Sequence, residues 1–232
     1  MDPALAGTGR DDDGMKRIAV VGPGGAGKST FARELGMRTG LPVVHLDRRY
    51  WRPGWVETPR EAWAALQAEL FSEDRWIADG NYGGTFDVRF ARADTVIVLA
   101  LPRLTCLVAA LRRSLRNRGT EVQAAGCPER VDFRFLQWIW RYEKDSRPRL
   151  DAALARHRGA STSLSFTPGA RSRRSCGLVP KSSSGVEGDR QPAFGAGSHA
   201  MVSAARSYRS TTQRRYGASR TVQRSTNAIG HN

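Results

Sequence analysis

Short apolar runs alternate along the first two thirds of the chain with longer stretches whose apolar residues recur at helical spacing. The runs have the length and composition of parallel strands buried on both faces, and they lie at residues 17–21, 41–46, 76–78 and 95–101. Helical patterns follow three of them, at residues 29–36, 59–70 and 102–118. Strands that alternate with helices in this way predict an α/β domain built on a doubly wound parallel sheet.

The second half of the pattern is mostly helical. The helix at 102–118 carries large apolar side chains that we expect to pack on the sheet, namely Leu104, Leu107, Val108, Leu111 and Leu115. Helices are also predicted at residues 128–144 and 148–157. The remaining segments are predicted to be a loop at residues 48–58, a helical turn at 86–91 and a short flexible segment at 119–127.

The character of the chain changes at Gly159, where large aliphatic residues become rare and Ser, Arg, Gly, Ala and Thr dominate. Such a composition cannot bury enough apolar surface to offset the entropy of ordering the chain. We therefore predict three parts: a disordered extension at 1–14, a folded domain at 15–158 and a basic, disordered tail at 159–232. Residues 161–166 are a trace of a last strand, and Met15, directly before the first strand, is an alternative start of the protein.

The charge is strongly positive, with 37 Lys and Arg residues against 22 Asp and Glu and a formal net charge of +15. Residues 159–232 hold eleven of the basic residues and only two acidic ones, so the tail carries much of the excess. No apolar run approaches the roughly 20 residues that span a bilayer. The three cysteines are far apart and fit neither a disulfide framework nor a zinc site. We expect a monomeric cytoplasmic protein with free thiols and no membrane association.

A glycine-rich loop between the first strand and the first helix is the most specific signal in the chain. It fits G-x-x-x-x-G-K-[ST] at every fixed position and spells Gly22-Pro23-Gly24-Gly25-Ala26-Gly27-Lys28-Ser29-Thr30. Glycines let the backbone wrap an anion, and the helix N-terminus adds partial positive charge. We expect this loop to bind the phosphates of ATP, with Lys28 at the β- and γ-phosphates and Ser29 on Mg²⁺.

Two aspartates follow other strands of the predicted sheet. Because ligands sit at the carboxyl ends of parallel strands, Asp47 and Asp79 should converge with Lys28. Asp79 is the candidate for holding Mg²⁺. For Asp47 three alternatives stay open: contact with Mg²⁺ through water, acceptance of a proton from a substrate hydroxyl, or pairing with Arg48 or Arg49.

Arginines crowd the end of the helix at 102–118, at positions 112, 113, 116 and 118. Arg112 and Arg116 share a helix face beside the flexible segment, as arginines that neutralise a transferring phosphoryl group do. The simpler interpretation is a solvated basic face. Trp51 and Trp55 could stack on a ligand ring, but packing within their own loop is the preferred interpretation. The guanine-reading Asn-Lys-x-Asp motif is absent from the sequence, which favours a small-molecule kinase.

Several short segments together resemble one family, the adenylate-kinase-related group known as DNA topology modulation proteins. They are His45-Leu46-Asp47, Trp51-Arg52-Pro53-Gly54-Trp55, Trp76 to Tyr82, Gly126-Cys127-Pro128-Glu129-Arg130 and Trp138-x-Trp140-x-Tyr142. The resemblance covers about residues 15–158. It implies a phosphate-loop kinase fold with five parallel strands, a helical substrate insertion and a short lid, and ATP and Mg²⁺ as cofactors. By position, Arg112 and Arg116 resemble lid arginines, and Arg141, Arg147 and Arg149 resemble the nucleotide-binding arginines after the lid.

The chain departs from that family after about Arg158, where relatives continue with a fifth strand and a closing helix. An Arg/Ser/Gly-rich tail is what a shifted reading frame would encode, and we interpret it so in preference to a natural disordered extension. The leading functional hypothesis is an ATP-dependent kinase acting on a nucleotide or another small metabolite. The alternatives are a nucleic-acid-associated protein that uses its basic tail and a non-catalytic nucleotide-binding regulator.

Overall fold

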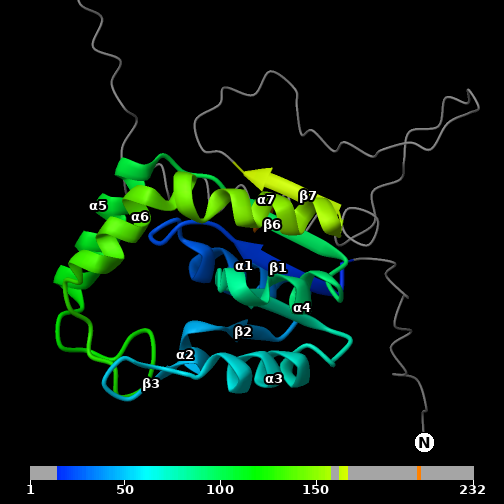
Figure 1. Ribbon diagram of the computed structural model, residues 1–232, viewed down its shortest axis with the longest axis horizontal. Coiled ribbons are helices and arrows are strands. Elements are labelled where there is room, and N and C mark those ends of the chain that lie inside the picture. Colours follow the sequence, from blue (N-terminus) through cyan, green and yellow to red (C-terminus); the bar gives the residue numbers. More distant parts are fainter. Residues whose placement is uncertain (1–14, 158–161, 167–202, 205–232) are drawn as a thin grey trace, which may run out of the picture.

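A five-stranded parallel sheet forms the centre of the molecule (Figure 1). The computed structural model describes residues 15–157, 162–166 and 203–204. The strand order is β2-β5-β1-β6-β7, and every neighbouring pair is parallel. The strands are β1 (Arg17–Val21), β2 (Val43–His45), β5 (Trp76–Asp79), β6 (Thr95–Leu99) and β7 (Thr162–Phe166). The predicted α/β class with a parallel sheet is therefore confirmed.

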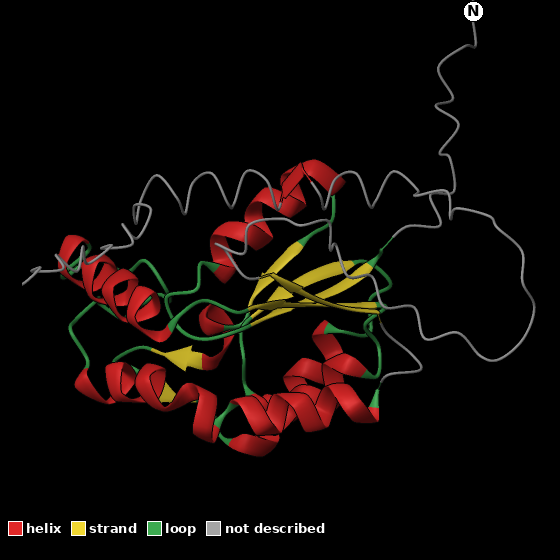
Figure 2. Ribbon diagram, turned by 90° about the horizontal axis from the view of Figure 1, so that it is seen from above, coloured by secondary structure: helices red, strands yellow, loops and turns green. Residues whose placement is uncertain are grey.

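Helices cover both faces of the sheet (Figure 2). Alternate residues of β1 enter two different cores, Ile18 and Val20 on one face and Ala19 and Val21 on the other. The first core includes residues of α1 (Lys28–Thr39), α5 (Arg103–Arg116) and α6 (Phe133–Asp145). The second includes residues of α3 (Arg60–Leu70), α4 (Phe86–Phe90) and α7 (Arg147–Arg156). Burial on both faces explains why the strands read as apolar runs without alternation.

The segment between β2 and α3 is more ordered than the predicted loop at 48–58. It forms a short helix, α2 (Asp47–Tyr50), and an antiparallel hairpin of β3 (Trp51–Arg52) and β4 (Val56–Glu57). Tyr50 anchors the segment, because its ring lies 5.1 Å from that of Trp63 in α3 and 4.6 Å from that of Tyr82. The prediction of a loop was wrong, since strands of two residues leave no readable periodicity.

Of the large apolar residues predicted to pack on the sheet from helix α5, Leu107 lies against the first core, but the others do not. Four of its large apolar side chains, Leu104, Val108, Leu111 and Leu115, are 38–63% exposed. The buried positions are the small residues Cys106, Ala109, Ala110 and Ser114. The reason is steric: a Cβ on Gly25 of the phosphate loop would lie 2.2 Å from the Cys106 carbonyl oxygen, so loop and helix backbones are in contact and only small side chains fit between them.

Helix α6 begins at Phe133, later than predicted, because Asp132 caps it. The Asp132 carboxylate accepts hydrogen bonds from the backbone N–H groups of Arg134 and Phe135, at 2.8 and 3.3 Å. Residues 118–130, here called the lid, connect α5 to this cap. Their two ends pair as Gly119 N–H donates to the Glu129 carbonyl at 3.0 Å and Glu129 N–H to the Thr120 carbonyl at 2.8 Å.

Strand β7 lies beyond the predicted end of the domain at residue 158. It pairs with β6 from Thr95↔Thr162 to Leu99↔Phe166, so the fifth strand is present and β6 is not the edge of the sheet. Further on, Ala204 is helical and fully buried in the first core, and Arg38 donates to Ser203 Oγ at 2.8 Å.

The predictions of disorder for residues 1–14 and for the rest of the tail lie outside the described residues. In the part of the chain that is described, no helix is both long and apolar enough to cross a bilayer.

Candidate active site

The phosphate loop connects β1 to the first turn of α1. Gly22, Gly25 and Gly27 have φ angles of 144°, 76° and 79°, in the region that favours glycine. Close packing adds a second constraint, since a Cβ on Gly22 would lie 2.4 Å from the Leu99 carbonyl oxygen. Helix α1 begins at Lys28 with no side-chain cap at its N-terminus, which leaves that end of the helix suited to an anion.

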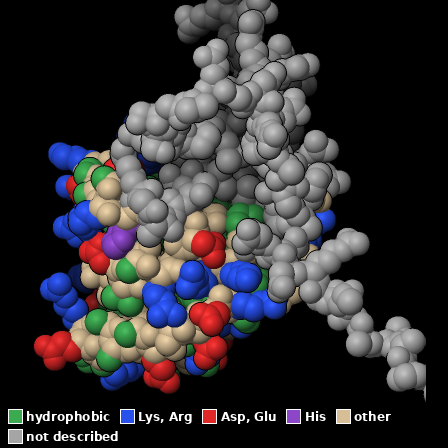
Figure 3. All heavy atoms as spheres, turned by 90° about the vertical axis from the view of Figure 1, so that its right-hand side faces the viewer, with side chains coloured by type: hydrophobic (Ala, Val, Ile, Leu, Met, Phe, Trp, Pro, Cys, Tyr) green, Lys and Arg blue, Asp and Glu red, His purple; other side chains and the backbone are tan. Residues whose placement is uncertain are grey.

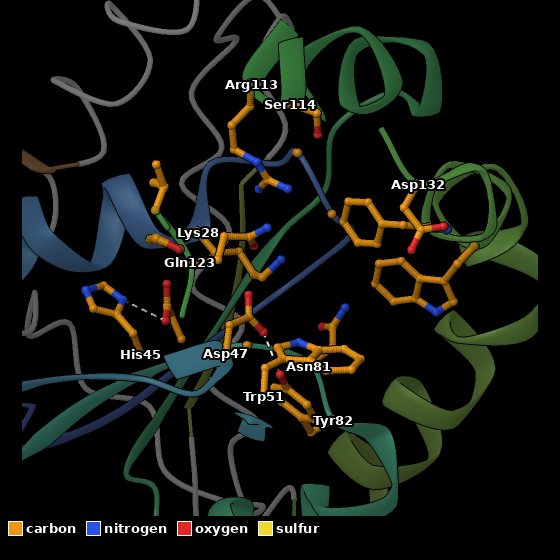
Figure 4. Close-up of a pocket in the computed structure, with 18 of the residues that line it drawn as sticks. Lys28, His45, Asp47, Trp51, Asn81, Tyr82, Arg113, Ser114, Gln123 and Asp132 are labelled. Atoms are coloured by element: carbon orange, nitrogen blue, oxygen red, sulfur yellow. Dashed lines mark hydrogen bonds and ion pairs between the residues drawn. The ribbon is translucent and has the colours of Figure 1, made fainter. Parts of the chain in front are cut away.

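Lys28 is partly buried at the base of the loop and faces the cavity (Figure 4). Its ammonium group donates to the carbonyl oxygens of Gly22 and Pro23, at 3.0 and 2.9 Å. Burial lowers the pKa of Lys28, and the carboxylates of Asp47 and Asp79 act in the opposite direction. The hydrogen-bond partners of the Lys28 ammonium group are thus two neutral carbonyl oxygens. A phosphate bound in the loop would be a stronger, charged partner.

Asp79, the last residue of β5, is 4% exposed and lines the same cavity. Its Oδ1 accepts a hydrogen bond from His45 Nδ1 at 2.9 Å, which fixes the orientation of the carboxylate. Its Oδ2 is buried without a hydrogen-bond partner. A buried carboxylate oxygen without a hydrogen-bond partner, in the same cavity as Ser29, fits Mg²⁺ or a metal-bound water.

A metal here would depend on more than protein ligands. No group of three or more His, Cys, Asp or Glu side chains suited to a metal ion occurs within the described part of the chain. Mg²⁺ in phosphoryl-transfer sites is typically held by one or two protein oxygens, substrate phosphates and water. The donor set of Ser29 and Asp79 fits that arrangement.

Asp47 begins α2 at the carboxyl end of β2. The Tyr82 hydroxyl donates to Asp47 Oδ1 at 2.6 Å, and no ion pair joins Asp47 to Arg48 or Arg49 among the residues described. Burial and the Asp47 carboxylate both raise the pKa of Tyr82, so the tyrosine stays a hydroxyl donor. Tyr82 has a φ of 45°, a left-handed conformation that places its ring against Tyr50.

Asn81 ties the end of β5 to the beginning of the phosphate loop. Its Oδ1 accepts from Gly22 N–H at 3.0 Å, and its Nδ2 donates to the Gly22 carbonyl at 2.6 Å. The Asn81 carbonyl in turn accepts from the buried guanidinium of Arg89, which also donates to Gln67 Oε1 at 3.2 Å. This network sets the position of the loop relative to Asp79.

The arginines divide into two groups. Arg112, Arg116 and Arg149 line the cavity. Arg141 and Arg147 do not, and each pairs within its own helix, with Asp145 at 2.7 Å and with Asp151 at 2.8 Å respectively.

Arg113 belongs to the arginine cluster at the end of α5, and the sequence predicted no separate role for it. In Figure 4 its side chain points toward Lys28. Its charge is among the causes that lower the pKa of Lys28.

One cavity of about 1210 Å³ is lined by Lys28, Ser29, Asp47, Asp79, Asn81, Tyr82 and the arginines at 112, 113, 116 and 149. Its lining includes nine Lys and Arg residues and five Asp and Glu residues, so its field attracts anions. Trp51 and Trp55 form part of the wall and contact each other edge to face, with ring centroids 5.5 Å apart. They therefore face the cavity as well as their own hairpin. The volume exceeds the usual range of ~300–1,000 Å³ for one small ligand, and it suits two.

The lid and the β3–β4 hairpin meet across the mouth of this cavity. Gly54 N–H donates to the Gly126 carbonyl at 2.7 Å, and Trp55 Nε1 donates to the Pro128 carbonyl at 3.0 Å. Cys127 Sγ lies 3.1 Å from the Arg52 carbonyl oxygen. A Cβ on Gly126 would lie 2.7 Å from Pro53, so the two segments are closely packed.

The sequence alone did not predict chemical roles for four residues that lie only within the segments of the family resemblance: His45, Asn81, Tyr82 and Glu129. The signal available was position: His45 ends β2, and Asn81 and Tyr82 follow β5 closely. Polar side chains at the carboxyl ends of parallel strands belong to the site by topology. Glu129 had no such signal, because its place depends on how the lid folds.

No family model matches the chain, and no curated protein matches it. Similar solved structures include shikimate kinase from Acinetobacter baumannii in complex with shikimate, with 16% identity, a TM-score of 0.47, and coverage of 88% of this chain and 96% of that one. An unliganded sugar kinase from a Janibacter species has 16% identity, a TM-score of 0.40, and coverage of 66% and 84%. Similarity at this level says nothing about the residues of the site. The strand order and the phosphate loop themselves show an α/β phosphate-loop fold.

Proposed function

We propose that this protein is an ATP-dependent kinase that transfers the γ-phosphoryl group of ATP to a hydroxyl group of a small molecule. The observation that carries the proposal is the convergence of Lys28, Asp47 and Asp79 on one cavity. These residues follow or end three neighbouring strands, β1, β2 and β5. A cation, a metal-binding carboxylate and a possible general base are the groups that phosphoryl transfer needs in one place.

The nucleotide side of the site is the phosphate loop. The loop amides and the N-terminus of α1 would bind the phosphates, and Lys28 would exchange its two carbonyl partners for phosphate oxygens. Ser29 and Asp79 would hold Mg²⁺, whose charge offsets that of the phosphates when it is bound. His45 binds Oδ1 of the Asp79 carboxylate and leaves Oδ2 without a hydrogen-bond partner, so Oδ2 is the oxygen that would serve the metal.

The acceptor side is formed by α2, the hairpin and Tyr82. The acceptor oxygen forms a bond to the γ-phosphorus, the bond from that phosphorus to the β–γ bridging oxygen breaks, and ADP leaves. The hydroxyl proton passes to Asp47, which Tyr82 orients through Oδ1. A base of this kind favours a hydroxyl over a phosphate acceptor, since an ionised phosphate has no proton to give and is repelled by a carboxylate. Arg112 and Arg116 would neutralise charge on the transferred group, and Arg149 lies in the same cavity.

The nucleic-acid alternative depends on the basic tail, most of which lies outside the described residues. On the face drawn in Figure 3, Lys and Arg side chains lie interspersed with Asp and Glu. The part of that face that the described residues form therefore has no basic surface free of acidic side chains. The regulator alternative differs from the kinase only in turnover, so turnover is the quantity to measure.

The test is ADP release from ATP with Mg²⁺ across a panel of hydroxylated metabolites and nucleoside monophosphates. We expect stimulation by a hydroxylated compound, and its loss in Lys28→Ala, because one preorganised cation at the transferring phosphate contributes ~3–4 kcal/mol. Lys16→Ala, the same change at an exposed lysine before β1, should leave the rate unchanged. ATP binding without stimulation by any acceptor would favour the regulator, and full activity in Lys28→Ala would reject the proposal.

A further inference from the structure

Glu129 is the only acidic residue of the lid that lines the cavity among the residues described, and it is 3% exposed. Its Oε1 accepts from Gln123 Nε2 at 2.7 Å, and its Oε2 accepts from Ser114 Oγ at 3.2 Å. Arg113 Nε lies 3.3 Å from the same Oε1. The carboxylate therefore joins the lid to two consecutive residues of α5.

Arg113 occupies a position that is electrostatically unfavourable for an unpaired cation. It is directed toward Lys28, and two cations in a partly buried site repel each other. The ring of Phe135 supports its guanidinium from the side, with 5.8 Å between the guanidinium carbon and the ring centroid. The carboxylate of Glu129 supplies the negative charge that holds Arg113 in this place when no phosphate is bound.

The fold of the lid does not require the Glu129 side chain. The two ends of the lid pair through backbone groups of Gly119, Thr120 and Glu129, and its tip is held by the contacts of residues 126–128 with the hairpin. A buried carboxylate is costly in such a place, and an apolar residue would serve packing at lower cost. The charge of Glu129 is therefore directed at Arg113.

We propose that Glu129 is a positioning residue: it aims Arg113 at the γ-phosphate of ATP while the lid is closed. The inference rests on the proposed kinase function. It concerns Arg113, whose guanidinium is ion-paired to the lid through Glu129. Presenting the arginine then depends on the closed lid, since Glu129 is part of the lid and reaches Arg113 from there.

The test is a double-mutant cycle on ADP release, together with the dissociation constant of Mg²⁺-ATP. Glu129→Gln keeps the shape and removes the charge, and we expect kcat to fall about ten- to hundredfold, as for a catalytic group displaced by about 1 Å. The dissociation constant should stay within threefold. In the Arg113→Met background, Glu129→Gln should change kcat by less than twofold, because there is no arginine left to aim.

The control is Glu121→Gln, the same change in the same lid. Glu121 is exposed, and its carboxylate accepts from Gly126 N–H at 2.8 Å without touching Arg113. It should have the kcat of the unaltered protein. Where Glu129→Gln does not fold, Glu129→Asp takes its place: it keeps the buried charge, withdraws it by one methylene, and should lower kcat about tenfold.

Three results would overturn the inference. The first is a normal kcat in Glu129→Gln or Glu129→Asp, and the second is an equal loss from Glu129→Gln with and without Arg113, which would indicate a structural role. In both, intact ATP turnover by the unaltered protein leaves the kinase proposal standing. The third is absence of ATP binding by the unaltered protein, which rejects the kinase and this role together.

Discussion

Asp79→Asn is the change that most clearly separates a functional carboxylate from a structural one. The amide has the shape of the carboxylate, and its oxygen can still accept the hydrogen bond from His45. What disappears is the negative charge on Oδ2, the oxygen that is buried without a partner. The substitution therefore removes one property of the site and leaves the packing around β5 in place.

The structure predicts opposite effects on function and stability. A hydrogen bond between a charged group and metal-bound water contributes ~1.5–3 kcal/mol, so affinity for Mg²⁺-ATP should fall about ten- to hundredfold at 1.4 kcal/mol per decade. Binding of metal-free ATP should be unchanged or tighter. A buried polar group without a partner costs ~1–3 kcal/mol, more when charged. Neutralising Asp79 should therefore raise the free energy of unfolding by about 1 kcal/mol, or about 2–4 °C in Tm.

Isothermal titration gives the affinity for Mg²⁺-ATP when Mg²⁺ is present and the affinity for metal-free ATP when EDTA is present. Thermal unfolding without nucleotide gives Tm. Asp94→Asn is the matched control. Asp94 precedes β6 at the opposite end of the sheet, and its Oδ2 accepts from the backbone N–H groups of Lys16 and Arg17 at 3.0 and 2.7 Å. This change should leave the ratio of the two affinities unaltered.

The reasoning fails if Asp79→Asn weakens both forms of ATP equally, because the carboxylate would then shape the loop and not serve the metal. A fall in Tm of several degrees would refute the stability argument separately. It would mean that Oδ2 has a partner that the geometry does not provide.

Three further predictions follow from the same site. Asp47→Asn should lower kcat at least a hundredfold in acceptor-stimulated ADP release with the ATP dissociation constant unchanged, and a normal kcat would remove Asp47 as the base. Burial lowers the pKa of Lys28, so this lysine loses its proton at a lower pH than an ordinary lysine does, and the affinity for ATP should fall with it. Binding titrations at a series of pH values from 7 upward should show this fall, and an affinity that stays constant up to pH 10.5 would contradict it. Gly25→Ala, with φ at 76° and Cys106 O 2.2 Å from the new Cβ, should destabilise the protein by ~3 kcal/mol or more in denaturant unfolding, whereas Gly84→Ala, which meets nothing within 4 Å, should have little effect.

The sheet and three site residues could be predicted because their signals are local. Apolar runs of three to seven residues mark the strands, and topology then brings Lys28, Asp47 and Asp79 to one edge. Residues 161–166 were interpreted only as a trace of a strand, since β7 is surrounded by residues of a different composition. Its pairing with β6 is a long-range contact that no local pattern reports.

The failures have physical causes in particular contacts. The face of α5 was mispredicted because Gly25 brings the loop backbone against Cys106, and steric exclusion there outweighs the burial of Leu104 and Leu115. The link from Tyr82 to Asp47 depends on a left-handed φ at a non-glycine residue, which propensities do not anticipate. The contact of Glu129 with Arg113 depends on the path of the lid, so sequence spacing could not place it.

The contact between residues 52–55 and 126–128 has a consequence for what can react here. The joined lid and hairpin, which lie side by side in Figure 1, contribute Trp51, Trp55, Gln123 and Glu129 to the wall of the cavity. Such a wall limits the size of an acceptor under the proposed kinase function, because the acceptor must fit inside the cavity. A folded protein or a nucleic-acid duplex is too wide to enter a cavity of about 1210 Å³.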